Sequence, residues 1–376
     1  MPKIILVGQR QGAPEAAAEQ LEWPYFVLHQ APLQRPPTAL EQGRLQCDFK
    51  VSESHRIFAH IQESMNDAEY AIPLTEGAVA LAAALQDRIE QTSFKHQHLA
   101  QRLTHKREMK EQAQKHGIPC ARFLTPADTV PDNWTYPCIV KTEVGSGSRG
   151  LAVIDNAKAL TKALKPGYLA ESFIVGKEFS VESFISGGKI LFTNITDYTE
   201  PRWENVLPAG FSETKQQEIL AFNARVIQAF EVHSGMTHLE LFDTEQGLVF
   251  GEMARRPPGG YIMDLLAQAY PIDPWRHYLQ SFTEQDFSLS NQAHCHVGVR
   301  MMHPGAGYLT HVSGTEAATR VPGAYRVKIT KKAPLQLKAR EGVGESSGYC
   351  MAHAQDARDV QNSLRTMTDL IHWHMT

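Results

Sequence analysis

The sequence has few cysteines, no long apolar run and no large excess of either charge, and each shortage narrows what the chain can do. Its five cysteines are scattered and odd in number, which favours free thiols in a reducing compartment over a disulfide framework or a zinc site. No apolar segment approaches membrane-spanning length, and the run 3–7 is too short for a secretion signal. A net charge of -4 gives no indication of a nucleic-acid or membrane partner. We therefore expect a cytoplasmic protein that acts on small molecules.

The N-terminal part of the chain alternates strand and helix signals. Residues 3–7 form an apolar, largely β-branched run, and 14–21 begin with a proline that suits the first turn of a helix. A second strand–turn–helix unit spans 71–89. This alternation predicts an open-sheet α/β domain over 1–95, in which ligands meet the carboxyl ends of strands. Glu76 follows such an end and is a candidate pocket residue, although a favourable charge at a helix start explains it equally well.

Longer elements follow this first domain. The periodicity predicts one charged helix over 98–116, a second helix over 213–231 and a closing helix over 354–374. Strands and turns return after about residue 293. Because a chain of 376 residues is longer than one core usually serves, two or three domains are expected.

The stretch 237–261 carries the most informative pattern. Residues 238–242 alternate polar and apolar side chains, turn residues follow, and 248–250 restart an apolar strand, so a β-hairpin is predicted. A short connection would bring Glu240 and Glu252 to face one point. Two such carboxylates repel one another, and a divalent cation with room for phosphate oxygens removes that conflict. The alternative is that both are solvated strand residues.

Two arginines directly follow the hairpin. Arg255 and Arg256 come just after Glu252, where cations suit an anionic group in transfer. The alternative is that they are surface partners of the glutamates.

A glycine-rich loop follows a strand that ends in Lys141. It consists of Gly145, Ser146, Gly147, Ser148, Arg149 and Gly150. The loop fits GxGxxG, but a strand rather than a helix follows it, which argues against a dinucleotide fingerprint. Lys141 precedes the glycines, which argues against a protein-kinase loop. The bare N–H groups of such a loop can instead close over phosphates, with Lys141 reaching back. A mobile turn without a ligand is the alternative.

The next strand signal, 168–170, leads into a segment that fits a purine. A strand that enters a loop offers paired backbone N–H and C=O groups, so we predict an adenine site at Glu171, Ser172, Phe173 and Ile174. Glu178 is a candidate acceptor for ribose hydroxyls. The alternative for Glu178 is a charge that protects an edge strand from mispairing.

These segments, in this order, resemble the ATP-grasp superfamily over most of the chain. Within it the sequence is similar to the L-amino-acid ligase branch, the carboxylate–amine ligases. This second resemblance is carried by 195–198, by the run from Glu252 to Gly260, and by the late HPGAGYL and VPGAYRVKI stretches. The resemblance implies an α/β (α+β) ATP-grasp fold with three parts. They are a Rossmann-like domain over 1–95, an ATP-grasp core over 96–290 with a lid at about 125–190, and a C-terminal β-rich segment over 291–376.

The resemblance also implies how ATP is bound. Lys106 and Lys141 would bind its phosphates, and the 145–150 loop would fold over them. Glu171 would sit at the adenine hinge and Glu178 at the ribose.

For the reaction, the resemblance implies that Glu240 and Glu252 ligate Mg²⁺, with Mn²⁺ as a substitute. Arg256 would stabilise an acyl phosphate and the tetrahedral species that follows. Lys141 would offset charge during phosphoryl transfer. The expected enzyme is an ADP-forming carbon–nitrogen ligase that joins a small carboxylic acid to an amine, both expected to be amino acids. A homodimer is expected, because dimers are common in these families.

Three features set this chain apart from related families. Ala254 stands where many ATP-grasp enzymes have an asparagine, so one metal oxygen is lost. Residues 203–208 lack the Gly-His pair that the ligase branch often carries, so substrate identity or the handling of the amine is expected to differ. Residues 257–260 replace the glutamate–histidine-rich run of biotin carboxylases, which argues against bicarbonate chemistry.

Substrate contacts are expected near strand ends and after the hairpin. The candidates are Glu76, Glu204, Arg255, Gly259 and Gly260. Two alternatives to amide ligation stay open. One is an ATP-grasp ligase or carboxylase with another acceptor, such as a thiol or a purine-pathway amine. The other is a degenerate module that binds nucleotide and regulates a partner, which Ala254 favours.

Overall fold

A computed structural model describes residues 1–147, 150–283 and 287–376, and its N-terminal unit is a parallel sheet of order β3–β2–β1–β4. The unit consists of β1 (Ile4–Val7), α1 (Ala13–Gln20), β2 (Tyr25–His29), β3 (Glu41–Gln46), the 3₁₀ turn η1 (Val51–Glu53), α2 (Ser54–Gln62), β4 (Tyr70–Pro73), the 3₁₀ turn η2 (Glu76–Ala78) and α3 (Val79–Ile89). Ile4 and Leu6 pack in a cluster with α1, whereas Ile5 and Val7 pack with α2 and α3. The strand is therefore buried on both faces, as its continuous apolar run predicted.

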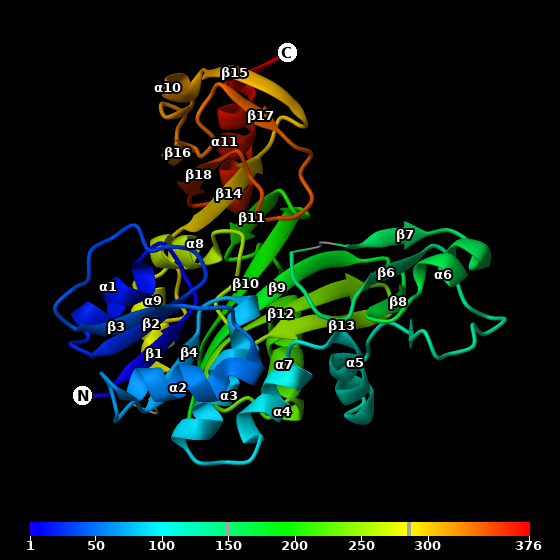
Figure 1. The fold of residues 1–376 in the computed structure, drawn as a ribbon. Coiled ribbons are helices and arrows are strands. Elements are labelled where there is room, and N and C mark those ends of the chain that lie inside the picture. The colour runs from blue at the N-terminus through cyan, green and yellow to red at the C-terminus, as the bar shows by residue number, and fades with distance from the viewer. Residues whose placement is uncertain (148–149, 284–286) are drawn as a thin grey trace.

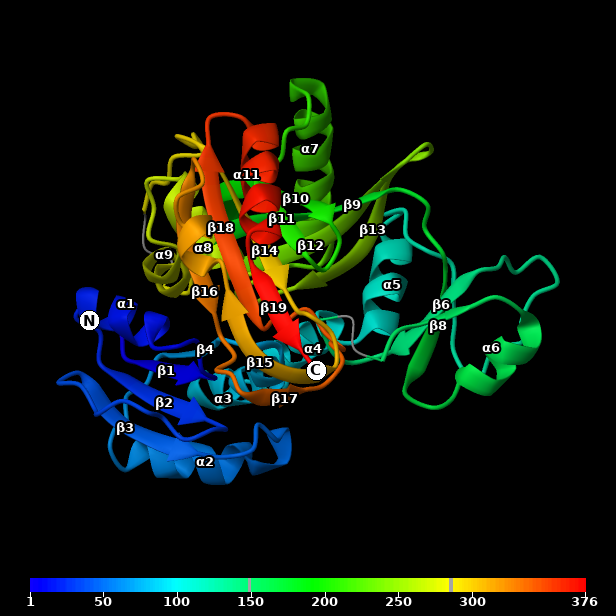
Figure 2. The ribbon, with the colours of Figure 1, turned by 90° about the horizontal axis from the view of Figure 1, so that it is seen from above.

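An antiparallel sheet of order β13–β12–β9–β10–β11–β14–β18–β16 forms the middle of the molecule. Its strands are β9 (Lys177–Ser186), β10 (Lys189–Glu200), β11 (Glu204–Leu207), β12 (Gly235–Thr244), β13 (Gly247–Ala254), β14 (His296–Met302), β16 (Ala324–Ile329) and β18 (Gly348–Ala354). Figures 1 and 2 show the N-terminal unit, in blue, on one side of this sheet and the β5–β8 unit, in green, on the other. A site on the central sheet can therefore receive residues from both units.

Helices cover both faces of the central sheet. Against one face pack α5 (Lys106–Lys115), α7 (Glu213–Ala229) and α11 (Ala357–Asp369). The other face shares an apolar core with the N-terminal sheet, α8 (Ile262–Ala269) and α9 (Pro274–Gln280). Ser212 and Asp356 begin α7 and α11 by accepting hydrogen bonds from first-turn N–H groups. Among the described residues, no helix combines the length and the apolar character needed to cross a bilayer.

Two smaller sheets extend from the centre. An antiparallel sheet of order β5–β8–β6–β7 has its own apolar core. It consists of β5 (Phe123–Leu124), β6 (Cys138–Thr142), β7 (Ala152–Ile154), α6 (Ala157–Ala163) and β8 (Tyr168–Ser172). The C-terminal sheet of order β17–β15–β19 consists of β15 (Gly307–Ser313), β17 (Leu335–Leu337) and β19 (His372–Met375), with α10 (Thr315–Ala318) beside it.

The single helix predicted over 98–116 is wrong, because the chain forms α4 (Lys95–Arg102) and α5 with a break between them. His105 is extended there, with φ −98° and ψ 108°, and it pairs with Val144. The N–H of Lys106 donates to the carbonyl of Glu143. Pairing with the end of β6 therefore interrupts the helix and fixes the start of α5 beside the glycine-rich loop.

The closing helix is also shorter than predicted. It ends at Asp369, and His372–Met375 form β19, which pairs antiparallel with β15. The half-buried Trp373 packs beside the cluster that α11 forms with β14 and β18. A distant strand therefore determines the conformation of the last residues.

Candidate active site

The β12–β13 hairpin places Glu240 directly opposite Glu252. Directly paired residues share a face of a sheet, so both carboxylates point away from the face that α5 and α7 cover. The register shifts just after this pair, where Gly251 is the extra residue of a β-bulge. A Cβ on Gly251 would lie 2.8 Å from the carbonyl oxygen of Glu240, so a larger residue would push the two strands apart.

The two carboxylates fit a divalent cation. Burial, and then the charge of Glu240, raise the pKa of Glu252 above its ordinary value. Within the described ranges, no group of three or more His, Cys, Asp or Glu side chains forms a metal cage. The two carboxylates would therefore need phosphate oxygens or water to complete the six ligands that Mg²⁺ prefers.

Two lysines lie beside this pair. The Nζ of Lys106, at the start of α5, donates to the carbonyl of Gly145 at 2.6 Å and lies 3.6 Å from an oxygen of Glu252. The Nζ of Lys141, on β6, lies 3.0 Å from Glu171. The structure thus brings both lysines from separate elements to the space between the loop and the hairpin.

Lys110 is a functional candidate that the sequence reasoning missed. Its side chain is 1% exposed, and its Nζ donates to the carbonyl of Gly251 at 2.9 Å and lies 3.5 Å from Glu171. Burial lowers the pKa of Lys110, and for Glu171 the two lysines outweigh burial and lower its pKa. The spacing of Lys106 and Lys110, four residues apart on one helix, was the signal available. Lys110 therefore links Lys141, through Glu171, to the backbone beside Glu252.

The glycine-rich loop begins beside Lys106 and reaches the C-terminal part of the chain. Gly145, Gly147 and Gly150 all have positive φ, which suits glycine. The carbonyl of Gly147 accepts a hydrogen bond from the N–H of Val343 at 3.3 Å. Ser146 lies between them, and Ser148 and Arg149 lie outside the described residues.

A pocket of about 650 Å³ opens next to the hairpin. It is lined by Phe173, Ile174, Val175, Gly176, Lys177, Glu178, Asp197, Tyr198, Thr199, Pro201, Phe242 and Gln361. The predicted adenine residues divide here. Phe173 and Ile174 line the pocket, whereas the hydroxyl of Ser172 accepts from the N–H of Arg122 and Glu171 faces the lysines.

Glu178 lies on the same face as the two hairpin glutamates. The edge-strand alternative for it is wrong, because β9 pairs with β10 on one side and β12 on the other. Burial, and then Glu240 and Glu252, raise the pKa of Glu178 to about 7. Glu178 is therefore close enough to the two hairpin glutamates for their charges to act on it.

The buried imidazole of His238 lies beside Glu240, two residues earlier on β12. His238 Nδ1 lies 2.9 Å from Glu182, and its Nε2 lies 3.6 Å from Glu240. Burial alone would lower the pKa of His238, but its contacts with these two carboxylates raise it to about 9. Glu182 is fully buried and also accepts hydrogen bonds from Ser180, Asn194 and Thr196. The sequence reasoning missed this network, whose signal was the two-residue spacing along β9, β10 and β12.

Arg256 and Glu76 meet although they are 180 positions apart. The Nε of Arg256 donates to Glu76 at 2.7 Å, and its Nη1 donates to the carbonyl of Pro257 at 3.1 Å. Glu76 begins η2, directly beyond the carboxyl end of β4. The predicted catalytic arginine and the predicted pocket glutamate therefore form one cluster between the N-terminal unit and the hairpin.

Arg255 does not join this cluster. Successive residues of an extended chain point to opposite sides, and its guanidinium donates to the backbone and the hydroxyl of Ser234 and lies 5.0 Å above the Phe282 ring. These contacts direct its guanidinium away from Glu76, and its role as a substrate contact stays a prediction.

Glu204 is likewise on the wrong face. On β11 it shares a face with Val206, which packs in the cluster of α11, and its carboxylate binds Arg300 at 2.9 Å and Thr199 at 2.7 Å. Asn205, one residue on, donates to the carbonyl of Gly260 at 3.0 Å. These contacts hold Glu204 on the face opposite Glu240, and its role as a substrate contact stays a prediction.

The two glycines differ in their surroundings. A Cβ on Gly260 would lie 2.5 Å from the amide nitrogen of Asn205, whereas a Cβ on Gly259 would meet no atom within 4 Å. Gly260 also has φ 59°, so the close approach of Asn205 requires a glycine there.

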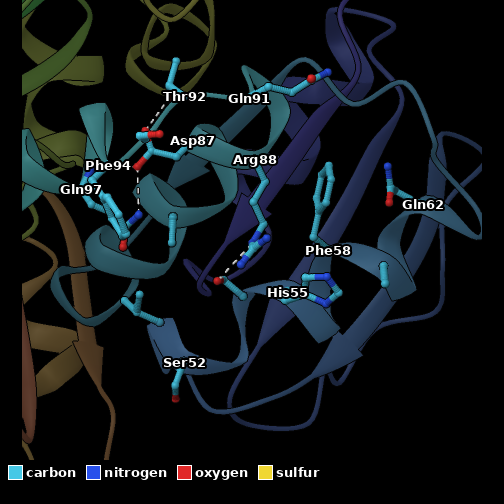
Figure 3. Close-up of a pocket in the computed structure, with 15 residues that line it drawn as sticks. Ser52, His55, Phe58, Gln62, Asp87, Arg88, Gln91, Thr92, Phe94 and Gln97 are labelled. Atoms are coloured by element: carbon cyan, nitrogen blue, oxygen red, sulfur yellow. Dashed lines mark hydrogen bonds between the residues drawn. The ribbon is translucent and has the colours of Figure 1, made fainter.

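A second pocket, also of about 650 Å³, lies on the N-terminal unit between α2 and α3 (Figure 3). Its polar groups bind one another: Arg88 donates to Ser54, and Asp87 accepts from Thr92 and Gln97. It shares no lining residue with the carboxylate cluster, so it lies outside the candidate site.

Comparison with known families places two family models on the chain. Residues 164–264 match the ATP-grasp domain, and residues 300–376 match the L-amino acid ligase C-terminal domain 2. The chain therefore contains one segment similar to the ATP-grasp domain and one similar to the C-terminal part of L-amino acid ligases. Its hairpin carboxylates and β9 lie within the first match, and β15, β19 and α11 lie within the second.

Two curated relatives align with most of this chain. An L-arginine-specific L-amino acid ligase of Bacillus subtilis is 26% identical over 303 residues, which span 73% of this chain and 72% of the relative. Dapdiamide A synthase of Enterobacter agglomerans is 24% identical over 349 residues, which span 81% of this chain and 80% of the relative. Both alignments are long enough to include the hairpin and its flanking segments.

Solved structures agree on the fold. The L-amino acid ligase from Bacillus licheniformis superposes with a TM-score of 0.83 at 16% identity, over 100% of this chain and 99% of that one. N5-carboxyaminoimidazole ribonucleotide synthetase from Thermotoga maritima gives a TM-score of 0.79 at 18% identity, over the full length of both. The expected ATP-grasp fold is therefore confirmed.

Proposed function

We propose that this ATP-grasp protein is an ADP-forming carboxylate–amine ligase that joins two small molecules, at least one of them an amino acid, through an acyl phosphate. The names of the curated relatives and the C-terminal family match support this activity. The observation that carries the proposal is the pairing of Glu240 with Glu252 beside two lysines, because phosphoryl transfer needs a cation and positive side chains at one point.

For nucleotide binding, we assign the phosphates to Lys106, Lys141 and the 145–150 loop. The loop amides and its glycines allow close approach of backbone to phosphate. Phe173 and Ile174 would cover the adenine, and Glu178 would accept from the ribose. With a pKa of about 7, Glu178 is half protonated near neutral pH in the nucleotide-free protein.

Glu240 and Glu252 would hold Mg²⁺, with Mn²⁺ as a substitute. The donor set fits, because two hard carboxylates are paired on one face of the hairpin, where burial and then the charge of Glu240 raise the pKa of Glu252. When bound, the cation supplies charge neutralisation for the phosphoryl group. His238 would orient the hairpin through its contact with Glu240, and Lys110 through its hydrogen bond to the carbonyl of Gly251.

Arg256 would stabilise the acyl phosphate and then the oxyanion that forms when a neutral amine attacks. Glu76, which now accepts from the Nε of Arg256, holds the guanidinium in place or exchanges it for a substrate ammonium. The glycine-rich loop 145–150 would close over the site and exclude water from the acyl phosphate. The products are ADP, phosphate and an amide.

The test is to incubate the purified protein with ATP, Mg²⁺ and single acid–amine pairs. The proposal predicts release of phosphate only when both substrates are present, with the amide detected by mass spectrometry. A nucleotide-binding module is the second candidate, which Ala254 favours because it replaces an expected metal ligand. Tight nucleotide binding without phosphate release, across amino acids and other acceptors, would support that module instead.

A further inference from the structure

Arg10 is a partly buried cation beside the catalytic cluster that no part of the proposed mechanism uses. It lies just beyond the carboxyl end of β1, where ligands bind in open parallel sheets. Its Nε donates to the carbonyl of Leu74 at 2.8 Å, and its Nη2 donates to the carbonyl of Pro257 at 3.0 Å. Both acceptors are neutral, so they orient the guanidinium without balancing its charge.

The charge of Arg10 adds to that of Arg256. Both guanidinium groups donate to the same Pro257 carbonyl, and Glu76 binds Arg256 alone. Across residues 1–147, 150–283 and 287–376, Arg10 forms no ion pair with a carboxylate. Burial, and then Arg256, lower the pKa of Arg10 to about 10. A buried positive charge without a partner is costly, so this cleft favours an anion.

The anion that fits here is not the transferred phosphoryl group. Lys106 and Lys141 surround that position, and neither contacts Arg10. Arg256 is near both groups, because its charge acts on Glu240 and it shares the Pro257 carbonyl with Arg10. The carboxylate that is activated must meet the nucleotide, so a second carboxylate needs its own cation.

Resting on the proposed function, we infer that Arg10 binds the carboxylate of the amine-donating substrate. A guanidinium offers two parallel N–H groups that match a carboxylate. The acceptor is then an amino acid, and its amine is held beside Arg256, where the activated carbonyl lies. A simple amine without a carboxylate leaves Arg10 unpaired and reacts poorly.

The test compares an amino-acid acceptor with its carboxamide, which keeps the amine and loses the negative charge. The carboxamide has no free carboxylate and is not activated itself, so the direction of ligation is unambiguous. For the wild type, kcat/KM is expected to be about 10- to 100-fold lower with the carboxamide. Arg10→Met should reduce kcat/KM for the amino acid to the level of the carboxamide and leave that of the carboxamide within about twofold. Arg10→Lys should recover part of the preference.

Two controls keep the test decisive. Arg56→Met makes the same change at an exposed arginine of the same unit, whose partner is Glu53, and should keep the full preference. Binding of Mg-ATP, measured by calorimetry, should be unchanged in Arg10→Met and shows that the variant is folded. If the variant keeps the amino-acid preference, or loses ATP affinity instead, the assignment is wrong. Absence of any acid- and amine-dependent turnover in the wild type would contradict the proposed function itself, which separates the two failures.

Discussion

The two charged regions of the candidate site, the strand carboxylates and the arginine pair, are built in opposite ways. On one side, Glu178, Glu240 and Glu252 come from neighbouring strands of one sheet. Their three carboxylates lie near two lysines, Lys106 and Lys141. On the other side, Arg10 and Arg256 come from segments far apart in the chain and share the Pro257 carbonyl, whereas Glu76 pairs with Arg256. We propose that the first region binds a cation and the second an anion. Such a division suits a ligase that must hold a metal nucleotide and a separate charged acceptor.

The largest expected effect is on the carboxylate side. Glu252→Ala removes half of the proposed metal site, so acid-dependent ADP release should fall by at least about 10³-fold while the fold is kept. A coupled assay for ADP, with circular dichroism as a check of folding, measures this. Glu245→Ala, at an exposed glutamate in the turn of the same hairpin, is the matched control. Wild-type turnover by Glu252→Ala would remove the metal-site argument.

On the arginine side, Arg256→Ala should separate chemistry from nucleotide binding. Loss of one donor to a developing oxyanion lowers kcat by about 10²- to 10³-fold, whereas the affinity for ATP should change only a few-fold. Steady-state kinetics and calorimetry with a non-hydrolysable ATP analogue measure the two quantities. A large loss of ATP affinity with normal kcat would place Arg256 on the nucleotide side instead.

Lys110→Met tests whether the hairpin carboxylates depend on Lys110, which contacts the Glu252 strand from α5. The variant leaves Glu171 with Lys141 alone and the Gly251 carbonyl without its donor, so the KM for ATP should rise roughly tenfold. In the double variant Lys110→Met/Glu171→Gln, the rise in the KM for ATP should be clearly smaller than the product of the two single rises. Lys115→Met, on the exposed face of the same helix, should behave as the wild type. Independent, multiplicative effects would contradict the link.

Glu178→Gln should change the pH dependence of stability. The pKa of Glu178 is raised from 4.5 to about 7, so the folded state holds this proton more tightly than the unfolded state. That stabilisation is present below pH 4.5 and is lost as the pH rises through 7. The Tm of the nucleotide-free wild type should therefore fall between pH 5 and 8 by a few degrees more than that of Glu178→Gln. Scanning calorimetry at pH 5 and pH 8 measures this difference. An equal fall in Tm for the two proteins would contradict the prediction.

The smallest effect on activity is expected for Glu204→Gln. Its carboxylate binds Arg300 on the opposite face of the sheet, so kcat/KM should stay within about twofold of the wild type. The Tm should fall, because Arg300 loses one of two carboxylate partners. A large loss of ligation at unchanged stability would return Glu204 to the site and blur the contrast between the two regions.

The carboxylate side was largely predictable from sequence because its information is local. Alternation along 238–242 specifies both the strand and the face of Glu240, and a short turn determines where Glu252 falls. The helix break near His105 and the final strand at His372–Met375 were missed for the opposite reason. Each depends on pairing with a distant segment, β6 in one case and β15 in the other.

The arginine side needed the structure. Arg10, Glu76 and Arg256 lie in three segments, and only the docking of the N-terminal unit on the hairpin brings them together. The direction of side chains on β11, whose register with β10 shifts, could not be predicted either. Glu204 seemed suitable by type, but the alternation of β11 turns it towards α11.

The central claim is that Glu240 and Glu252 together hold the cation that carries the nucleotide phosphates. Crystals grown with Mn²⁺ and ADP, with diffraction data collected at the manganese absorption edge, test it most directly. The account predicts an anomalous peak between the two carboxylates, with the ADP phosphates and the nitrogen of Lys141 next to it. Manganese at any other position, or ADP bound away from the hairpin, would contradict the account.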